Sequence, residues 1–181
     1  SGINWLDREL WSEAEKSGKL QNHIAGRKNT EEVLVIVHGC CVNFETALKS
    51  AAKLIKDTRF EGAGILFSWP AAGYSMASRP DVAKAVASRK DFVTLLGNIA
   101  EIEQVKHIHV VAHSLGNQIF LEALKDIGAA RDGGKISSKL GQLVFASPDV
   151  DDEIFQQTAA AILPMGKGAT LYASSRDKPL R

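Results

Sequence analysis

Short continuous apolar runs alternate along this chain with longer stretches in which apolar residues recur at helical spacing. The continuous runs are typical of strands buried on both faces of a parallel sheet. They predict strands at residues 33–37, 64–69, 107–113, 143–146 and 169–173. The periodic stretches predict helices at residues 4–16, 44–55, 80–99, 115–127 and 154–162. This alternation predicts an α/β fold, a doubly wound and mainly parallel sheet with helices on both faces.

The same pattern predicts one domain over residues 1–181, with an N-terminal helix and loop at 1–30 and the core at 31–181. Two polar stretches that contain helix breakers, 18–30 and 131–139, are interpreted as loops. Asn43 is expected to cap the helix that follows it, because its short side chain can accept a hydrogen bond from the first helical turn. Residues 80–99 are expected to form one long helix or two consecutive helices.

Composition and charge exclude several classes of protein. The chain is 45% hydrophobic and 24% charged, which is ordinary for a soluble globular protein. Its 22 Lys and Arg residues nearly balance 21 Asp and Glu residues, so no basic surface for nucleic acid is indicated. No apolar run reaches the length of a transmembrane helix. The sequence begins at Ser1 without a leader pattern, so we expect a trimmed start, and the cellular location and oligomeric state are not indicated.

Cys40 and Cys41 are the two cysteines of the chain and are adjacent. A disulfide between neighbouring residues is geometrically awkward, so no structural disulfide framework is predicted. Both are expected to be small buried residues.

The strand that ends at His113 runs directly into Ser114 and then into a helix. Ala112 and Gly116 lie two residues on either side of the serine, which matches the G-x-S-x-G elbow except for Ala at its first position. Such a turn exposes the serine Oγ and places the backbone N–H of Leu115 at a helix N-terminus, where it can stabilise an oxyanion. A serine before a helix is often only an N-cap, so the pattern alone is a weak signal.

A second motif lies upstream, where the first apolar strand ends in His38 and Gly39. In a fold with a serine elbow, this loop supplies the second oxyanion donor, here most simply the N–H of Cys40. An ordinary turn between strand and helix is the alternative. The loop at 71–79 follows the next strand, and in it Tyr74 and Met76 are candidate substrate-binding residues of a pocket wall.

Four acids follow the fourth predicted strand, at Asp149, Asp151, Asp152 and Glu153. They could suggest a divalent cation, but acids that open a helix serve as caps and interact favourably with its dipole. No metal and no cofactor is therefore predicted.

Five motifs in this order resemble a known family. They are His38-Gly39, Phe67-Ser68-Trp69-Pro70, Ala112-His113-Ser114-Leu115-Gly116-Asn117, Ser147-Pro148-Asp149-Val150-Asp151 and Tyr172-Ala173-Ser174-Ser175-Arg176-Asp177. Together they resemble the bacterial α/β-hydrolases of unknown function, relatives of the lipases and esterases. The resemblance implies Ser114 as nucleophile and the N–H groups of Leu115 and Cys40 as the oxyanion hole. It implies Asp177 as the acid, with Asp149 as the alternative.

The expected chain order of this fold is serine, acid, then histidine, but no histidine follows Ser114. His107 and His109 begin the preceding strand, roughly 17 Å from the serine along an extended backbone, too far for proton transfer. His113 is expected to pack beneath the elbow, because neighbours on a strand point to opposite faces. His38 is the nearest candidate base, although in its loop it is better suited to order the oxyanion backbone.

The simplest expectation is that the native protein continues past Arg181 into a strand and loop that carry the histidine. The fold would then be shortened at both ends, since residues 1–30 show no strand pattern either. A degenerate hydrolase and a base from a partner chain are the alternatives.

The sequence thus predicts a serine hydrolase of the esterase or lipase type that cleaves a small-molecule or lipid ester through an acyl-enzyme on Ser114. The alternative is a non-catalytic domain that binds a ligand or a protein partner. Physiological substrate and acyl length are not indicated.

Overall fold

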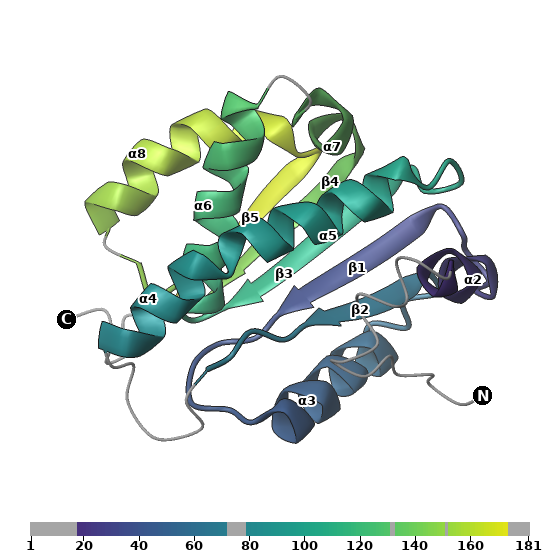
Figure 1. The fold of residues 1–181 in the computed structure, drawn as a ribbon, viewed down its shortest axis with the longest axis horizontal. Coiled ribbons are helices and arrows are strands. Elements are labelled where there is room, and N and C mark those ends of the chain that lie inside the picture. The colour runs from purple at the N-terminus through teal and green to yellow at the C-terminus, as the bar shows by residue number, and fades with distance from the viewer. Residues whose placement is uncertain (1–17, 72–78, 131–132, 151, 174–181) are drawn as a thin grey trace.

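The computed structural model describes residues 18–71, 79–130, 133–150 and 152–173. Five strands form one sheet in the order β2-β1-β3-β4-β5, and every neighbouring pair is parallel (Figure 1). The strands are β1 (Glu32–Val37), β2 (Ala63–Phe67), β3 (His107–His113), β4 (Leu140–Ala146) and β5 (Gly168–Tyr172). All five predicted strands are confirmed, and the sheet is the parallel one that the alternation of elements predicted.

The helices cover the two faces of the sheet unequally (Figure 1). They are α2 (Lys19–Ala25), α3 (Phe44–Asp57), α4 (Arg79–Ala87), α5 (Arg89–Glu101), α6 (Gly116–Ala129), α7 (Gly133–Lys139) and α8 (Asp152–Ile162), followed by a 3₁₀ turn at Leu163–Met165. Alternate residues of β1 point to opposite faces, as a strand requires. Val33 and Val35 join the large core under α5 and α6, whereas Leu34 and Ile36 join a small cluster under α3.

The predicted helices inside the described residues are confirmed. The stretch at 80–99 forms two helices, α4 and α5, that meet at Ser88. Asn43 caps α3, because its side chain accepts a hydrogen bond from the Thr46 N–H at 2.9 Å. The helix expected at 4–16 lies outside the described residues.

Two predicted loops are helices, so that interpretation was wrong. In the stretch at 18–30, α2 buries Leu20 and Ile24, which are four residues apart and therefore share one helix face. In the stretch at 131–139, α7 buries Ile136 against the same core. Both helices are only seven residues long. Their few apolar residues give almost no periodicity in the sequence, and packing on the core stabilises them instead.

β5 is an edge strand of the sheet that the described residues form, and there Leu171 is 50% exposed and Tyr172 is 64% exposed. Within the described ranges, no helix combines the length and apolar character that crossing a membrane requires.

Candidate active site

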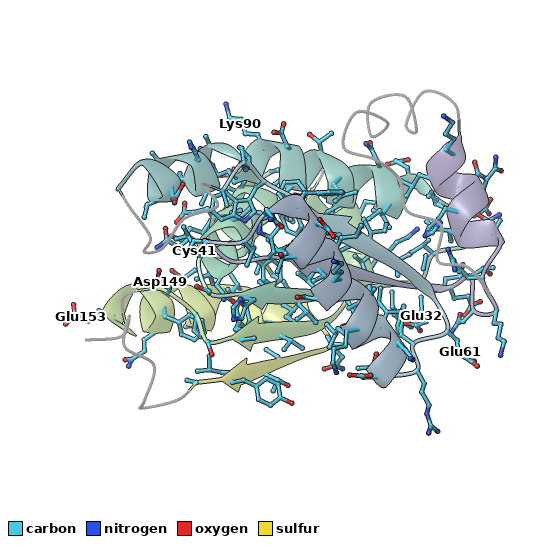
Figure 2. The ribbon with its side chains drawn as sticks, turned by 90° about the horizontal axis from the view of Figure 1, so that it is seen from below. Glu32, Cys41, Glu61, Lys90, Asp149 and Glu153 are labelled. Carbon is cyan, nitrogen blue, oxygen red and sulfur yellow. The ribbon has the colours of Figure 1, made fainter. Side chains whose placement is uncertain are left out.

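The motifs that follow β1, β2, β3 and β4 begin at the carboxyl edge of the sheet. Because all five strands are parallel, the loops that leave β1, β2, β3 and β4 emerge at this one edge. Figure 2 shows Cys41 and Asp149 at this end of the molecule and Glu32 and Glu61 at the other.

Ser114 follows β3 in the backbone conformation that a nucleophile elbow requires. Its φ is +50°, in the left-handed region that non-glycine residues rarely adopt. Hydrogen bonds to the end of β4 and to Asn117 hold this turn. Ser114 N–H donates to Ala146 O at 3.0 Å, and Asn117 Nδ2 donates to Ser114 O at 2.9 Å and to Ala146 O at 3.2 Å. Asn117 is fully buried. Through its two hydrogen bonds, its side-chain amide connects the elbow to the end of β4. Strain of this kind persists only where surrounding structure enforces it.

Two glycines let the backbone pack closely around the serine. A Cβ on Gly39 would lie 2.8 Å from Ser114 Cβ, and one on Gly116 would lie 2.6 Å from His38 O. Both distances are shorter than real Cβ atoms show. The loop after β1 and the start of α6 can therefore lie against the elbow only because neither position carries a side chain.

Two backbone donors near Ser114 have no hydrogen-bond partner within the described part of the chain. They are the N–H groups of Leu115, just before α6, and of Cys40, just after Gly39. The N-terminus of α6 adds the positive end of a helix dipole beside Leu115. These are the two donors that the sequence predicted for an oxyanion hole.

His38 is locked in place by both ring nitrogens. Nδ1 lies 2.7 Å from Gly39 O and Nε2 lies 3.3 Å from Ser68 Oγ, so Nδ1 carries the proton and Nε2 accepts the Ser68 hydroxyl. The ring stacks on Trp69, whose Nε1–H donates to His38 O at 2.8 Å. Burial lowers the pKa of His38, which favours the neutral ring. No hydrogen bond joins His38 to Ser114 among the described residues.

Sequence reasoning missed the partnership of His38 with Ser68 and Trp69. The sequence does hold one indication of this partnership. His38 directly follows β1, Ser68 and Trp69 directly follow β2, and these two strands are parallel neighbours.

His113 does not pack beneath the elbow, and that expectation was wrong. Its side chain is exposed, and a Cβ on Gly39 would lie 3.0 Å from its Nδ1. The residues of β3 that face the large core are Ile108, Val110 and Ala112. His113 therefore shares the opposite face with Val111, and there the described helix cover is α3 alone.

The two candidate acids differ in what the structure describes. Asp149 follows β4 and is anchored to the elbow, because its N–H donates to Ser114 O at 3.3 Å and its carbonyl accepts from Gln118 Nε2 at 2.8 Å. Burial raises the pKa of the Asp149 carboxyl. Asp177, Tyr74 and Met76 lie outside the described residues.

The two cysteines are half-buried, not fully buried as expected. The loop that carries them leaves β1 at the edge of the sheet, and its backbone turns at Cys41 with a φ of +64°. The sulfur atoms lie 3.1 Å apart. Burial and the Cys41 thiol raise the pKa of Cys40 to about 11.

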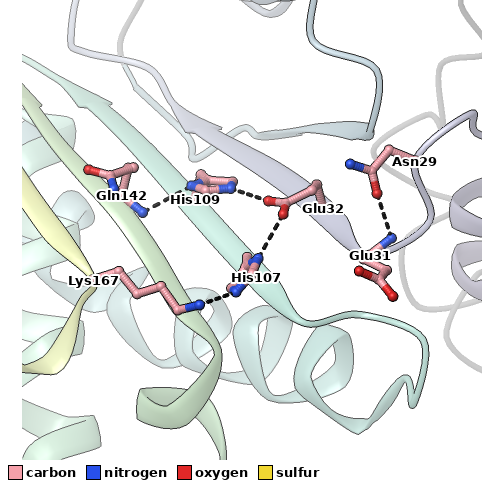
Figure 3. Close-up of polar contacts among 7 residues, drawn as sticks. All are labelled: Asn29, Glu31, Glu32, His107, His109, Gln142 and Lys167. Carbon is pink, nitrogen blue, oxygen red and sulfur yellow. Dashed lines mark hydrogen bonds and ion pairs between the residues drawn. The ribbon is translucent and has the colours of Figure 1, made fainter.

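At the opposite edge of the sheet, Glu32 joins two histidines that the sequence did not connect to it (Figure 3). His107 Nδ1 donates to Glu32 at 2.7 Å, and His109 Nε2 donates to its second oxygen. His109 Nδ1 accepts the Gln142 N–H at 2.9 Å, so that nitrogen carries no proton, and Lys167 Nζ donates to His107 Nε2. This arrangement disfavours a metal at His109. An imidazole that binds a metal through Nε2 normally keeps its proton on Nδ1, but here Nδ1 accepts a hydrogen bond and carries no proton. Consistent with this, no three His, Cys, Asp or Glu side chains of the described ranges form a metal-binding group.

One comparison with known proteins identifies a family for this chain. A family model described as "Alpha/beta hydrolase of unknown function (DUF900)" matches residues 12–181. A solved structure of a lipase-esterase related protein from Clostridium acetobutylicum is 16% identical, with a TM-score of 0.33. The alignment covers 72% of this chain and 49% of that one, so the chain spans about half the length of this structure. A search among curated proteins finds none that matches.

Proposed function

Because the chain belongs to a family of α/β hydrolases of unknown function, we propose that it is a serine hydrolase that cleaves carboxylic esters of small molecules or lipids. The observation that carries the proposal is Ser114, held at a φ of +50° between β3 and α6. A buried amide and a close glycine contact maintain this unfavourable backbone conformation. Strained backbone of this kind clusters at active sites, where it is part of the mechanism.

In the proposed reaction, Ser114 Oγ attacks the ester carbonyl carbon and its proton passes to a base. The N–H groups of Leu115 and Cys40 donate to the oxyanion that develops on the carbonyl oxygen. Collapse of the tetrahedral intermediate expels the alcohol and leaves an acyl group on Ser114, which water then removes. His38 positions the oxyanion loop in this scheme, because its Nδ1–H holds the Gly39 carbonyl.

We keep Asp177 as the proposed acid and Asp149 as its alternative. The raised pKa of Asp149 and the anchoring of its backbone on the elbow make it a specific competitor. In an active preparation, we expect Asp177→Asn to abolish ester turnover and Asp149→Asn to retain it. The reverse result would assign the role to Asp149.

The test of the nucleophile is intact-mass labelling with a fluorophosphonate, with Ser114→Ala as the control. A base must lie within hydrogen-bond reach of a serine to activate it, and no described imidazole makes that bond. The assay is therefore run with and without added imidazole, which can replace a base from solution. We expect one adduct per chain that Ser114→Ala removes. A wild-type chain that stays unlabelled in both conditions would contradict the proposal.

A non-catalytic domain that binds a ligand or a protein partner is the second candidate. The environment of His38 favours it, since both ring nitrogens are occupied away from Ser114. This candidate predicts that Ser114 is unreactive in every form of the protein.

A further inference from the structure

Cys40 and Cys41 form a pair whose sulfur atoms lie in contact in the loop between β1 and α3. In extended backbone, adjacent side chains point to opposite sides, and two neighbouring thiols stay apart. Here Cys41 adopts a φ of +64°, and the loop turns so that the two Sγ atoms are 3.1 Å apart. Both side chains are partly exposed, so a small oxidant can reach them.

We propose that Cys40 and Cys41 are a redox-modification site, at which hydrogen peroxide converts the adjacent thiols into a reversible disulfide. The left-handed backbone at Cys41 already brings the sulfurs together, so the oxidised form needs a local change of the loop and no movement of a helix or strand.

The chemistry consumes one peroxide and releases two waters. The thiolate of one cysteine attacks a peroxide oxygen, the O–O bond breaks, and the sulfur becomes a sulfenic acid as hydroxide leaves and is protonated. The sulfur of the other cysteine then attacks this sulfur, the S–O bond breaks, and the proton of the attacking thiol leaves with the second water. Two thiols lose two electrons in total, and the peroxide gains them.

The surroundings of the pair affect how readily Cys40 loses its proton. Burial, the adjacent thiol of Cys41 and the carboxylates of Asp149 and Asp81 together raise the pKa of Cys40, so this thiol keeps its proton at neutral pH. Oxidation of either sulfur leads to the same disulfide, because the partner sulfur lies 3.1 Å away and can resolve the sulfenic acid.

The product is a strained and therefore easily reduced disulfide. The described peptide bonds are all trans. Consecutive Cα atoms across a trans peptide are about 3.8 Å apart, below the range of roughly 4.4–6.8 Å found in ordinary disulfides. Strained disulfides have more oxidising potentials and are the labile, regulatory ones.

Oxidation would also change the candidate active site, a consequence that rests on the proposed function. The N–H of Cys40 is one of the two proposed oxyanion donors, and Gly39 lies against Ser114. Bringing the sulfurs to bonding distance reorients the peptide between the two cysteines and the backbone that precedes it. We therefore expect disulfide formation to slow acylation of Ser114.

The first experiment tests the modification without using activity. The chain is treated with stoichiometric hydrogen peroxide, and intact mass, free thiols and tryptic peptides are measured before and after dithiothreitol. We expect the loss of two hydrogen masses, the loss of both free thiols on one peptide, and full recovery with dithiothreitol. Phenylarsine oxide, which bridges paired thiols, should bind the reduced chain and not the oxidised one. Cys41→Ser is the control and should show neither change.

Gain of two or three oxygen masses without loss of hydrogen, or a disulfide between two chains, would overturn the proposal. A chain that remains fully reduced and still binds phenylarsine oxide would overturn it too.

The second experiment links the pair to Ser114. Fluorophosphonate labelling of the reduced chain should slow by about tenfold after peroxide and recover with dithiothreitol. Labelling of Cys41→Ser should not respond to peroxide. If the reduced chain is never labelled, the proposed function fails while the mass measurement still decides the redox site. If labelling proceeds equally in both redox states, only the coupling between the two sites is wrong.

Discussion

Gly39 shows how one missing side chain shapes the candidate site. Its backbone lies so close to the elbow that an added Cβ would be 2.8 Å from Ser114 Cβ, 3.0 Å from His113 Nδ1 and 3.2 Å from His113 O. From the sequence, this glycine was placed only in the loop that follows the first apolar strand. The structure shows that it also makes room for the serine of a different strand.

We predict that Gly39→Ala destabilises the fold by about 1–3 kcal/mol, because the new methyl group overpacks the contact with Ser114. Guanidinium unfolding would measure the loss of unfolding free energy. The rate at which fluorophosphonate labels Ser114 should decrease in the same variant. Gly134→Ala is the matched control, since a Cβ there meets nothing within 4 Å and the residue lies in α7. That change should leave stability equal or slightly higher, as alanine favours a helix. Equal losses in the two variants would contradict the close contact at Gly39.

Other residue-scale features followed from the sequence because they are local. Ser114 at a strand-to-helix turn, its small neighbours and the cap at Asn43 depend on residues only a few positions apart. The partners of His38 did not follow, since Ser68 and Trp69 are about thirty residues away and only strand pairing brings them close.

At the scale of elements, Glu32 connects strands that are distant in the sequence. The acid on β1 accepts hydrogen bonds from His107 and His109 on β3, and His109 accepts the Gln142 N–H of β4. The register between β3 and β4 shifts at this point, which leaves His109 opposite an extra residue of β4. A Cβ on Gly141 would lie 2.7 Å from the His109 ring, so the irregularity and the glycine together make room for it.

This network predicts a pH-dependent contribution to stability. Burial alone would raise the pKa of Glu32, but the hydrogen bonds from His107 and His109 outweigh it and lower the pKa below the ordinary 4.5. The unfolded chain therefore binds the proton more readily than the folded one. The stabilisation is complete above pH 4.5 and is lost as the pH falls through the lower folded value.

We predict that Glu32→Gln lowers the free energy of unfolding by about 1–3 kcal/mol at neutral pH, because its amide nitrogen would face an imidazole N–H. The difference from wild type should shrink as the pH falls below about 4, which urea unfolding at a series of pH values would measure. Glu61→Gln is the control, since the Glu61 carboxylate pairs with the exposed Lys28 at 3.5 Å and little change is expected. If the difference in unfolding free energy between wild type and Glu32→Gln stayed constant from pH 7 to 3, the lowered pKa of Glu32 would be contradicted.

At the scale of the whole molecule, the described helices cover one face of the sheet well and the region around β5 poorly. β1 is flanked by β2 and β3 and is buried on both faces, whereas β5 lies at the edge with one neighbour. The side chains of β5 consequently contribute much less buried apolar area than those of β4.

A matched pair of leucines on these neighbouring strands tests this difference. Leu143 of β4 is fully buried, and Leu171 of β5 is 50% exposed. We predict that Leu143→Ala costs about 2–5 kcal/mol of unfolding free energy, because it opens a cavity that the core cannot close. Leu171→Ala should cost less than half as much. Thermal unfolding would measure both, and equal costs would show that β5 is covered in solution.

The sequence by itself determined the fold class, the five strands in their order along the chain, the longer helices between them and the turn that carries Ser114. These features are encoded by local periodicity, by caps and by small residues next to the serine, so they can be read without knowing what each element touches. Tertiary structure alone decided that α2 and α7 are helices, that both nitrogens of His38 are occupied, that Glu32 joins two histidines and that two sulfurs lie in contact. Each of these depends on packing or strand pairing between residues far apart in the chain, or on a single backbone angle that no pattern specifies.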